Sequence, residues 1–323
     1  ARYELVKTMR ASILVLGPLL SRYHEAEVAL PGGCAIGSRP VNLHIDCMRQ
    51  LGAEIDIVDG YIKAKAKGGL KGGDINFSNV TVTGTENAIM AGVLAKGTTT
   101  ISNAAKEPEV VDLVACLRKM GAKIFGEGTD RIEINGVNAL EPCDYSVMAD
   151  RIEIGTYLTA VTMTKGNVSI KCSLPSVLET ILDKLKIAGA NIQIDEEGIN
   201  LEMDKIPNPV NISTAPFPLF PTDMQAQFIA LNSISKGKSK VIENVFENRF
   251  MHVQELIRMG GNIRLEGNTA YIEGNTEGLT AAPVMATDLR ASASLVLAGL
   301  VAKGQTKVCL LYTSDAADDR LRV

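Results

Sequence analysis

The sequence predicts an α/β protein built from repeated units of about 70 residues. In four stretches a helix-like run ends at a glycine and an alternating strand follows. These glycines stand at positions 52, 121, 189 and 260, with spacings of 69, 68 and 71 residues. Glycine suits the position after a helix because it adopts positive φ at little cost. A Lys-Gly pair recurs at similar intervals, at Lys96-Gly97, Lys165-Gly166, Lys236-Gly237 and Lys303-Gly304.

The elements of each copy follow from local signals. In the first copy, strands are expected at 53–57 and 61–64, joined by a tight turn at Asp59-Gly60. The second copy runs through 117–124 and returns at 131–134, and the third and fourth include 185–192 and 257–263. The apolar helices that end at Lys-Gly should open at small polar or acidic residues, which bond free N–H groups: Thr85-Glu86-Asn87, Asp150-Arg151, Thr222-Asp223 and Thr287-Asp288.

Composition narrows the class of protein. The chain has 323 residues, 46% of them hydrophobic and 22% charged, as in a globular protein of one large or two medium domains. Its net charge of -4 gives no reason to expect nucleic acid or an acidic membrane as a partner. No apolar run is long enough to span a bilayer, and no signal segment is present. The six cysteines are scattered without disulfide-framework or zinc spacing, which indicates a reducing cytoplasm.

The loop at 30–40 is the first candidate site. Its glycines and prolines exclude a regular helix or strand, and it carries Cys34 with Arg39 five residues later. Exposure and a nearby cation would favour a reactive thiolate. The alternative is a half-buried cysteine in a structural turn, and spacing alone does not separate the two interpretations.

Other candidates lie at helix starts. Arg10 and Arg290 occupy matching Arg-Ala-Ser stretches, where a guanidinium beside helix N–H groups suits a phosphate or carboxylate, although each could form a surface salt bridge. On the sequence alone, Asp223 is interpreted as the cap of its own helix. The stretch 246–252 mixes charges with aromatic residues and suggests either a polar site or a charged turn. No P-loop and no GxGxxG motif is present.

Four stretches then carry a family resemblance. Residues 31–41, 220–227, 246–252 and 286–292 resemble, in order, the signature segments of the UDP-N-acetylglucosamine 1-carboxyvinyltransferases, which are enolpyruvyl transferases. The resemblance implies a two-domain inside-out α/β barrel. Domains are expected at 1–148 and 149–308, with a non-family tail at 309–323 that fits neither the repeat nor the family and is interpreted as out-of-frame or adapter-derived sequence.

The resemblance also implies an activity: transfer of the enolpyruvyl group of phosphoenolpyruvate to the 3-hydroxyl of UDP-N-acetylglucosamine, a step of peptidoglycan synthesis. Cys34 resembles the proton donor that fosfomycin alkylates, Asp223 the carboxylate facing the sugar hydroxyl, and Arg290 a catalytic cleft arginine. No metal or redox cofactor is implied, and the partners are the two small substrates. The other implied substrate contacts are Arg10, Arg39, Pro40, Val41, Asn42, Leu43, Asn79, Val80, Thr81, Val82, Val245, Arg249 and Asp288.

Departures from the family leave alternatives open. The family has a preceding segment with a Lys-Asn pair and a later arginine-bearing stretch, which this sequence does not match. Asn42 stands where relatives often carry Asp, and Asn79 where some carry Lys. The alternatives are an inactive fragment that retains weak sugar-nucleotide binding, the sister transferase acting on shikimate 3-phosphate, and a non-enzymatic paralogue.

Overall fold

The fold is described from a computed structural model, which covers residues 3–6, 9–31, 41–286 and 288–311. This part of the chain divides into two compact units between Val147 and Met148. Each unit is described by itself, and "first unit" and "second unit" refer to the residues before and after this division.

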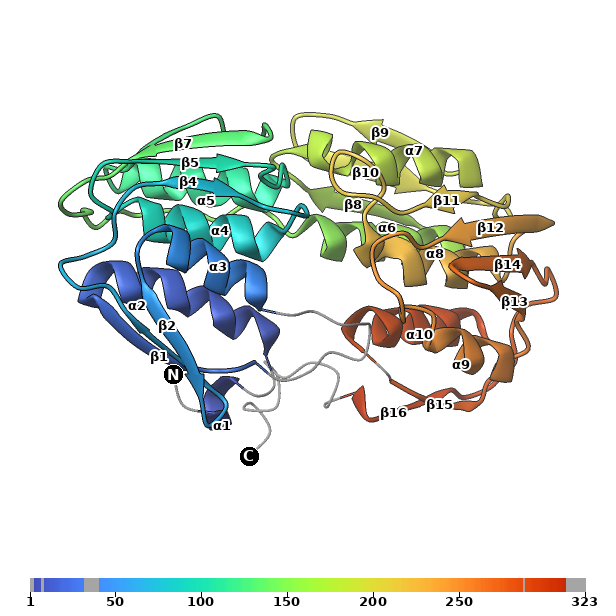
Figure 1. The fold of residues 1–323 in the computed structure, drawn as a ribbon. Helices are drawn as coiled ribbons and strands as arrows, with labels where there is room; N and C mark the ends of the chain where they lie inside the picture. The colour runs from blue at the N-terminus through green and yellow to red at the C-terminus, as the bar shows by residue number, and fades with distance from the viewer. Residues whose placement is uncertain (1–2, 7–8, 32–40, 287, 312–323) are drawn as a thin grey trace. The chain divides into compact units, whose positions relative to one another are not determined.

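The first unit contains two α/β copies (Figure 1). Its two sheets have the strand orders β1-β3-β2 and β4-β5-β7-β6, and all neighbouring strands are antiparallel except β4 and β5. Its elements are α1 (Tyr3–Val6), the 3-10 helix η1 (Arg10–Val15), α2 (Leu16–Tyr23), β1 (Glu25–Ala29), α3 (Asn42–Gln50), β2 (Glu54–Val58), β3 (Tyr61–Lys65), β4 (Asp74–Asn76), α4 (Val82–Gly92), β5 (Thr98–Ser102), α5 (Pro108–Lys119), β6 (Lys123–Phe125) and β7 (Arg131–Asn135).

The second unit continues the same alternation. Its sheets have the orders β8-β10-β9, β11-β12-β14-β13 and β15-β16. The elements are α6 (Arg151–Thr164), β8 (Asn167–Lys171), η2 (Pro175–Leu178), α7 (Glu179–Ala188), β9 (Asn191–Ile194), β10 (Gly198–Glu202), β11 (Ile212–Ser213), η3 (Thr222–Met224), α8 (Gln225–Asn232), β12 (Lys238–Ile242), α9 (His252–Arg258), β13 (Asn262–Glu266), β14 (Thr269–Glu273), β15 (Pro283–Met285), α10 (Leu289–Val301) and β16 (Lys307–Cys309).

The glycine repeat behaves as predicted. Gly52, Gly121, Gly189 and Gly260 all have positive φ, between 88° and 107°. The predicted turn at Asp59-Gly60 is confirmed, since both residues have positive φ and Val58 pairs with Tyr61. The second Lys-Gly pair differs from expectation: Lys165 itself takes the left-handed conformation, with φ of 58°. A positive φ at a residue with a side chain is uncommon, so glycine was the expected occupant.

The predicted start of one helix is wrong, and the first residue of the expected tail lies in a strand. Helix α4 begins at Val82 rather than near Thr85, because Thr81 is its cap and accepts a hydrogen bond from the Gly84 N–H at 3.2 Å. Cys309, which was assigned to a tail, pairs with Met285 in the parallel β15–β16 ladder. By contrast, Asp150 and Asp288 cap α6 and α10 as expected.

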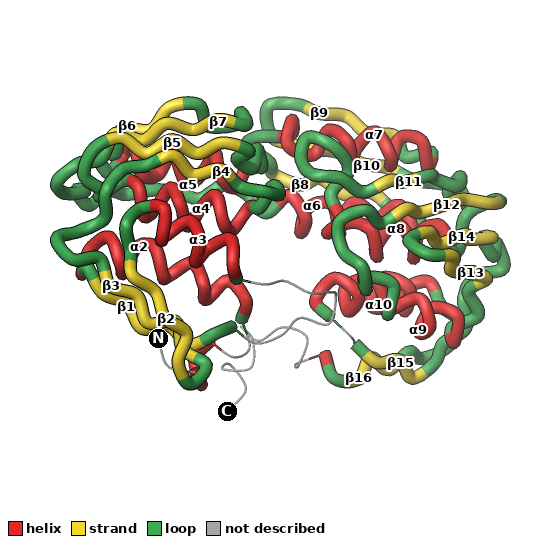
Figure 2. Tube along the Cα trace, viewed as in Figure 1, coloured by secondary structure: helices red, strands yellow, loops and turns green. Residues whose placement is uncertain are grey.

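The buried helices form the centre of each unit. Every residue of α8 is buried, and α8 contacts α6 and α10. In the first unit α2 and α4 lie inside while the strands run along the periphery (Figure 2). The contact between α2 and α4 is close at Gly17: a Cβ there would lie 2.3 Å from Asn87 Oδ1, and the Gly17 N–H donates to that oxygen at 2.7 Å. The absence of a side chain therefore permits this helix crossing.

Within the described ranges, no helix is both long and apolar enough to cross a membrane.

Candidate active site

An aspartate held between two arginines is the centre of the candidate site in the second unit. Arg249 Nη2 lies 2.6 Å from Asp223 Oδ1, and Arg290 Nη2 lies 3.3 Å from Oδ2. Asp223 belongs to η3, Arg249 precedes α9, and Arg290 is the second residue of α10. Three segments far apart in the sequence are thus brought together, and these are three of the residues that the sequence analysis singled out.

The two guanidinium groups control the charge of this aspartate. Burial by itself would raise the pKa of Asp223, but Arg249 and then Arg290 outweigh it and lower that pKa below its usual value. The carboxylate is therefore ionised throughout the neutral range. Its side chain is 39% exposed, whereas that of Arg249 is only 5% exposed. A ligand can therefore reach the Asp223 carboxylate, while the buried Arg249 holds that carboxylate in place.

A second carboxylate orients Arg249. Arg249 Nη1 donates to Thr222 Oγ1 at 2.8 Å, and the Thr222 hydroxyl in turn donates to Glu243, whose oxygens lie 2.9 and 3.0 Å away. Glu243 directly follows β12 and is buried. The planar Arg249 fork is thereby fixed in one orientation. Its guanidinium carbon also lies 5.1 Å from the centre of the Phe246 ring.

Glu243 also fixes the backbone at Val245. Its Oε1 accepts from the Val245 N–H at 2.9 Å and from the Phe246 N–H at 3.1 Å. Because the N–H of Val245 is engaged, its carbonyl oxygen is the backbone group that it can offer to a ligand. A backbone contact at Val245, as the resemblance implies, would thus accept a hydrogen bond rather than donate one.

Asp288 has a local structural role. Its Oδ1 accepts from the N–H groups of Arg290 and Ala291, each at 3.0 Å, so it caps α10. This cap fixes the helix start from which Arg290 extends towards Asp223. Asp223, in contrast, makes no side-chain cap: η3 has no side-chain cap bond, and its carboxylate bonds the arginines. The capping interpretation of Asp223 is therefore wrong.

Several buried polar groups of the second unit have no hydrogen-bond partner among the described residues. Among the described residues, His252 is fully buried and neither of its ring nitrogens has a hydrogen-bond partner. Burial, and then the charge of Arg249, lower the pKa of His252 to about 3. The His252 imidazole is thus neutral at physiological pH. The Nε of Arg249 and both amide atoms of Gln225 are also buried without partners among the described groups.

In the first unit, the predicted loop falls partly outside the described residues. Cys34, Arg39 and Pro40 lie there, so the structure says nothing of them. Val41 precedes α3, and Asn42 and Leu43 form its first turn. Asn79 and Val80 are exposed just before Thr81 and Val82, where α4 begins. Both implied sugar-nucleotide segments therefore lie at helix N-termini, where N–H groups face outward.

A buried histidine and an asparagine join these helix starts. Asn87 Nδ2 lies 3.0 Å from His44 Nδ1 and donates to the Ile13 carbonyl in η1, also at 3.0 Å. His44 Nε2 lies 3.4 Å from Thr83 Oγ1 in the first turn of α4. Burial, and then the charge of Arg10, lower the pKa of His44 to about 4. Arg10, the start of α3 and the start of α4 are thus neighbours around a neutral imidazole.

Sequence reasoning missed the supporting residues. Glu243, His44 and Asn87 were not proposed for the site. A signal for Glu243 was present: this acidic residue directly follows the alternating strand Lys238–Ile242 and lies three residues before the Phe246–His252 motif. No such signal exists for His44, because one sequence gives no sign of the α3–α4 contact that buries it. No group of three His, Cys, Asp or Glu side chains in the described ranges is placed to hold a metal ion.

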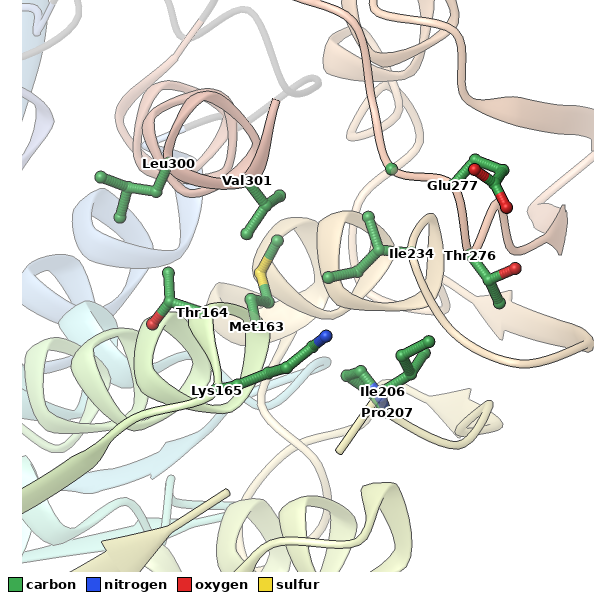
Figure 3. A pocket seen from close by; sticks show the side chains of 11 residues that line it. Met163, Thr164, Lys165, Ile206, Pro207, Ile234, Thr276, Glu277, Leu300 and Val301 are labelled. Carbon is green, nitrogen blue, oxygen red and sulfur yellow. The ribbon is translucent and has the colours of Figure 1, made fainter. Parts of the chain in front are cut away.

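A separate cavity of about 310 Å³ lies at the other ends of the central helices (Figure 3). It is lined by Thr164 and Lys165 at the end of α6, Ile234 after α8, and Leu300 and Val301 at the end of α10. The candidate residues Asp223, Asp288 and Arg290 are at the N-terminal ends of the same set of helices. This cavity therefore contains none of the predicted site residues.

Comparison with known proteins shows the family of the chain. The family model described as EPSP synthase (3-phosphoshikimate 1-carboxyvinyltransferase) matches residues 1–316. The chain belongs to this family of enolpyruvyl transferases. Within it, the chain is 60% identical over 316 residues to UDP-N-acetylglucosamine 1-carboxyvinyltransferases from two strains of Coxiella burnetii, covering 98% of this chain and 73% of each relative. The resemblance drawn from the sequence is confirmed.

Solved structures confirm the fold class. The chain is similar to the enolpyruvyl transferase NikO from Streptomyces tendae, with a TM-score of 0.81 and 23% identity over 94% of this chain and 73% of that one. It is also similar to EPSP synthase from Acinetobacter baumannii, with a TM-score of 0.68 and 18% identity over 97% of this chain and 76% of that one. At such identities the likeness concerns the fold alone, the inside-out α/β barrel of enolpyruvyl transferases.

Proposed function

We propose that this chain transfers the enolpyruvyl group of phosphoenolpyruvate to the 3-hydroxyl of UDP-N-acetylglucosamine and releases phosphate. The observation that carries the proposal is the 60% identity over 98% of the chain to enzymes named for that reaction. The arrangement of Asp223 between Arg249 and Arg290 supports it, because it places fixed cations and an ionised carboxylate at one point.

The reaction is an addition followed by an elimination. As the sugar hydroxyl adds to C2 of phosphoenolpyruvate, C3 gains a proton; loss of a C3 proton and of phosphate then restores the double bond. Asp223 orients the 3-hydroxyl and accepts its hydrogen bond. Because its pKa is lowered, it acts mainly by orientation and charge, and only weakly as a base. Each Asp223 oxygen accepts one hydrogen bond from an arginine, and a carboxylate oxygen can accept a further one.

The arginines serve the anionic substrate. Arg249 and Arg290 present two fixed guanidinium groups beside Asp223, and these are the donors suited to the carboxylate or phosphate of phosphoenolpyruvate. Such fixed donors stabilise charge that develops during the reaction without having to reorganise. Asp288 contributes by holding the start of α10, and Val245 contributes its carbonyl to the sugar.

The first unit supplies the sugar-nucleotide contacts and the proton donor. We assign Cys34 as the general acid that protonates C3, with the adjoining Arg39, Pro40, Val41, Asn42 and Leu43 as contacts. Arg10 and the segment Asn79–Val82 complete this set. The helix N-termini of α3 and α4 suit the diphosphate of a sugar nucleotide. The proposal requires no metal or redox cofactor.

A second acceptor has support from the family description. The matching model is named for 3-phosphoshikimate, so shikimate 3-phosphate is the alternative substrate. The solved EPSP synthase from Acinetobacter baumannii is only 18% identical, against 60% for the UDP-N-acetylglucosamine enzymes, which favours the sugar nucleotide. A third candidate function is binding of the sugar nucleotide without catalysis. Only product formation distinguishes this function from the main proposal.

The proposed setting follows from the reaction. We place the protein in the cytoplasm, at the first committed step of peptidoglycan synthesis, with roles in cell-wall biogenesis, cell shape, cell division and the cell cycle. The partners are the two small substrates, with no nucleic acid and no membrane.

Fosfomycin labelling tests the proposed thiol. The purified chain is treated with fosfomycin with and without UDP-N-acetylglucosamine, and the adducts are located by mass spectrometry. We expect one adduct, on Cys34, whose formation the sugar nucleotide accelerates. Equal labelling of several cysteines, or labelling indifferent to the sugar nucleotide, would contradict the assignment of Cys34. The Cys34→Ser variant, which should take up no adduct, is the control.

A further inference from the structure

A segment after the last strand of the first unit lies along helix α5. The Glu141 N–H donates to the Met120 carbonyl, just after the end of α5, at 2.8 Å. Four residues later, the Tyr145 hydroxyl lies 3.1 Å from the carbonyl oxygen of Asp112 and 2.9 Å from its Oδ1. Between them, Lys119 Nζ bonds the Asp144 carbonyl. The segment is therefore fixed to the helix at both ends and runs antiparallel to it.

The spacing places two cysteines opposite each other. Asp112 and Met120 are eight residues apart, which is about 12 Å along a helix. Residues 141–145 contain no helix or turn, and four extended residues span about 13 Å. The midpoint of the segment, Cys143, therefore lies beside the midpoint of the helical stretch, Cys116.

The influence of Cys143 on the pKa of Cys116 agrees with this alignment. Cys116 and Cys143 share a side-chain hydrogen bond, and both are partly buried and free of a disulfide. Burial, the neighbouring thiol and Asp112 raise the pKa of Cys116, while Lys119 acts in the opposite direction. The thiolate fraction at neutral pH is thus small, and exchange should be slow until an oxidant is supplied.

We propose that Cys116 and Cys143 form a reversible disulfide, an oxidation site separate from the loop thiol Cys34. The oxidant is a low-molecular-weight disulfide. One protein thiolate attacks a sulfur of the oxidant, forming a mixed disulfide and releasing one small thiol; the second protein thiolate then attacks the mixed disulfide and releases the other. Two protein thiols are oxidised, one small disulfide is reduced to two thiols, and the two protons pass to the released thiolates.

The bond would fasten a connecting segment to its helix. Cys143 lies just before the division between Val147 and Met148, and Cys116 belongs to the body of the first unit. A disulfide there closes a loop that contains β6 and β7, and such a loop restricts the unfolded chain. We therefore expect oxidation to raise the thermal midpoint of the first unit by several degrees.

The experiment uses the full chain with Cys34→Ser, so that the loop thiol does not compete. The protein is treated with excess oxidised glutathione, quenched in acid, and analysed by intact and peptide mass spectrometry. We expect the loss of two thiols, no retained glutathione, a cross-linked pair of peptides carrying Cys116 and Cys143, and full reversal by dithiothreitol.

Two variants make the result decisive. Adding Cys143→Ser should abolish the cross-link and leave at most a glutathione adduct on Cys116. Adding Cys309→Ser, which removes another partly buried cysteine, should leave the cross-link unchanged. A stable glutathione adduct on Cys116 or Cys143 in the chain that retains both, or a cross-link to another cysteine, would overturn the proposal. None of these outcomes depends on enolpyruvyl transfer.

Discussion

Replacing Arg249 with lysine tests whether its fork holds the candidate site together. In the structure one guanidinium bonds Thr222 Oγ1 at 2.8 Å and Asp223 Oδ1 at 2.6 Å, and it covers the Phe246 ring. A lysine ammonium can keep the ion pair with Asp223, but it cannot reproduce the planar fork. The variant should therefore lose the bond to Thr222 and most of the ring contact.

The magnitude follows from these losses. A hydrogen bond to a charged group contributes about 1.5–3 kcal/mol, and a cation–π contact at a partly exposed ring contributes about 0.5–1 kcal/mol. Because Arg249 is 5% exposed, solvent replaces little of what is lost. We expect Arg249→Lys to lower the free energy of unfolding by about 2–3 kcal/mol.

Urea denaturation with a matched control measures this effect. Arg258 is 61% exposed and pairs with Glu255 at 3.4 Å within the same helix. Exposed pairs contribute little, so Arg258→Lys should change the free energy of unfolding by less than about 0.5 kcal/mol. If Arg249→Lys cost no more than Arg258→Lys, the fork would not support the site and the reasoning would be refuted.

Three further predictions follow from the same contacts. The folded-state pKa of His252, about 3, lies below the ordinary histidine value of about 6.5, so stability should fall as pH drops below about 6.5. His252→Leu should reduce the loss of unfolding free energy between pH 7.5 and 5 by about 2 kcal/mol. If the urea midpoint of the variant fell between these pH values as much as that of the unchanged chain, this prediction would be contradicted. Gly17→Ala should destabilise the first unit by about 1–3 kcal/mol, because its Cβ would meet Asn87, whereas Gly166→Ala, with its nearest atom at 3.7 Å, should not lower the thermal midpoint. Asp223→Asn should reduce turnover by about 10²-fold, because it removes the charge of the carboxylate that orients the sugar hydroxyl, while sugar-nucleotide binding, measured by calorimetry, stays within a few-fold. Turnover near that of the unchanged chain would contradict the role of Asp223.

Much of the fold was predictable because its signals are local. The repeating glycines mark helix ends through their need for positive φ, and Asp150 and Asp288 mark helix starts through capping. The start of α4 was misplaced because Thr81, four residues before the predicted position, supplies the cap. Lys165 adopts the left-handed conformation that was expected of Gly166, and no intrinsic propensity of lysine favours that conformation.

The candidate site was only partly predictable because it depends on distant contacts. The motifs identified Asp223, Arg249 and Arg290, and the structure brings these three together. The sequence could not show that Asp223 bonds arginines instead of capping its helix, since both roles use the same carboxylate. Glu243 and His44 were missed because their importance comes from burial against other elements, which one sequence does not reveal.

Product analysis tests the central claim most directly. The chain is incubated with phosphoenolpyruvate and either UDP-N-acetylglucosamine or shikimate 3-phosphate, and products and phosphate are quantified by mass spectrometry and a phosphate assay. We predict an enolpyruvyl adduct of the sugar nucleotide, formed in equal amount with phosphate, and none with shikimate 3-phosphate. The absence of that adduct, or a product from shikimate 3-phosphate instead, would contradict the proposed function.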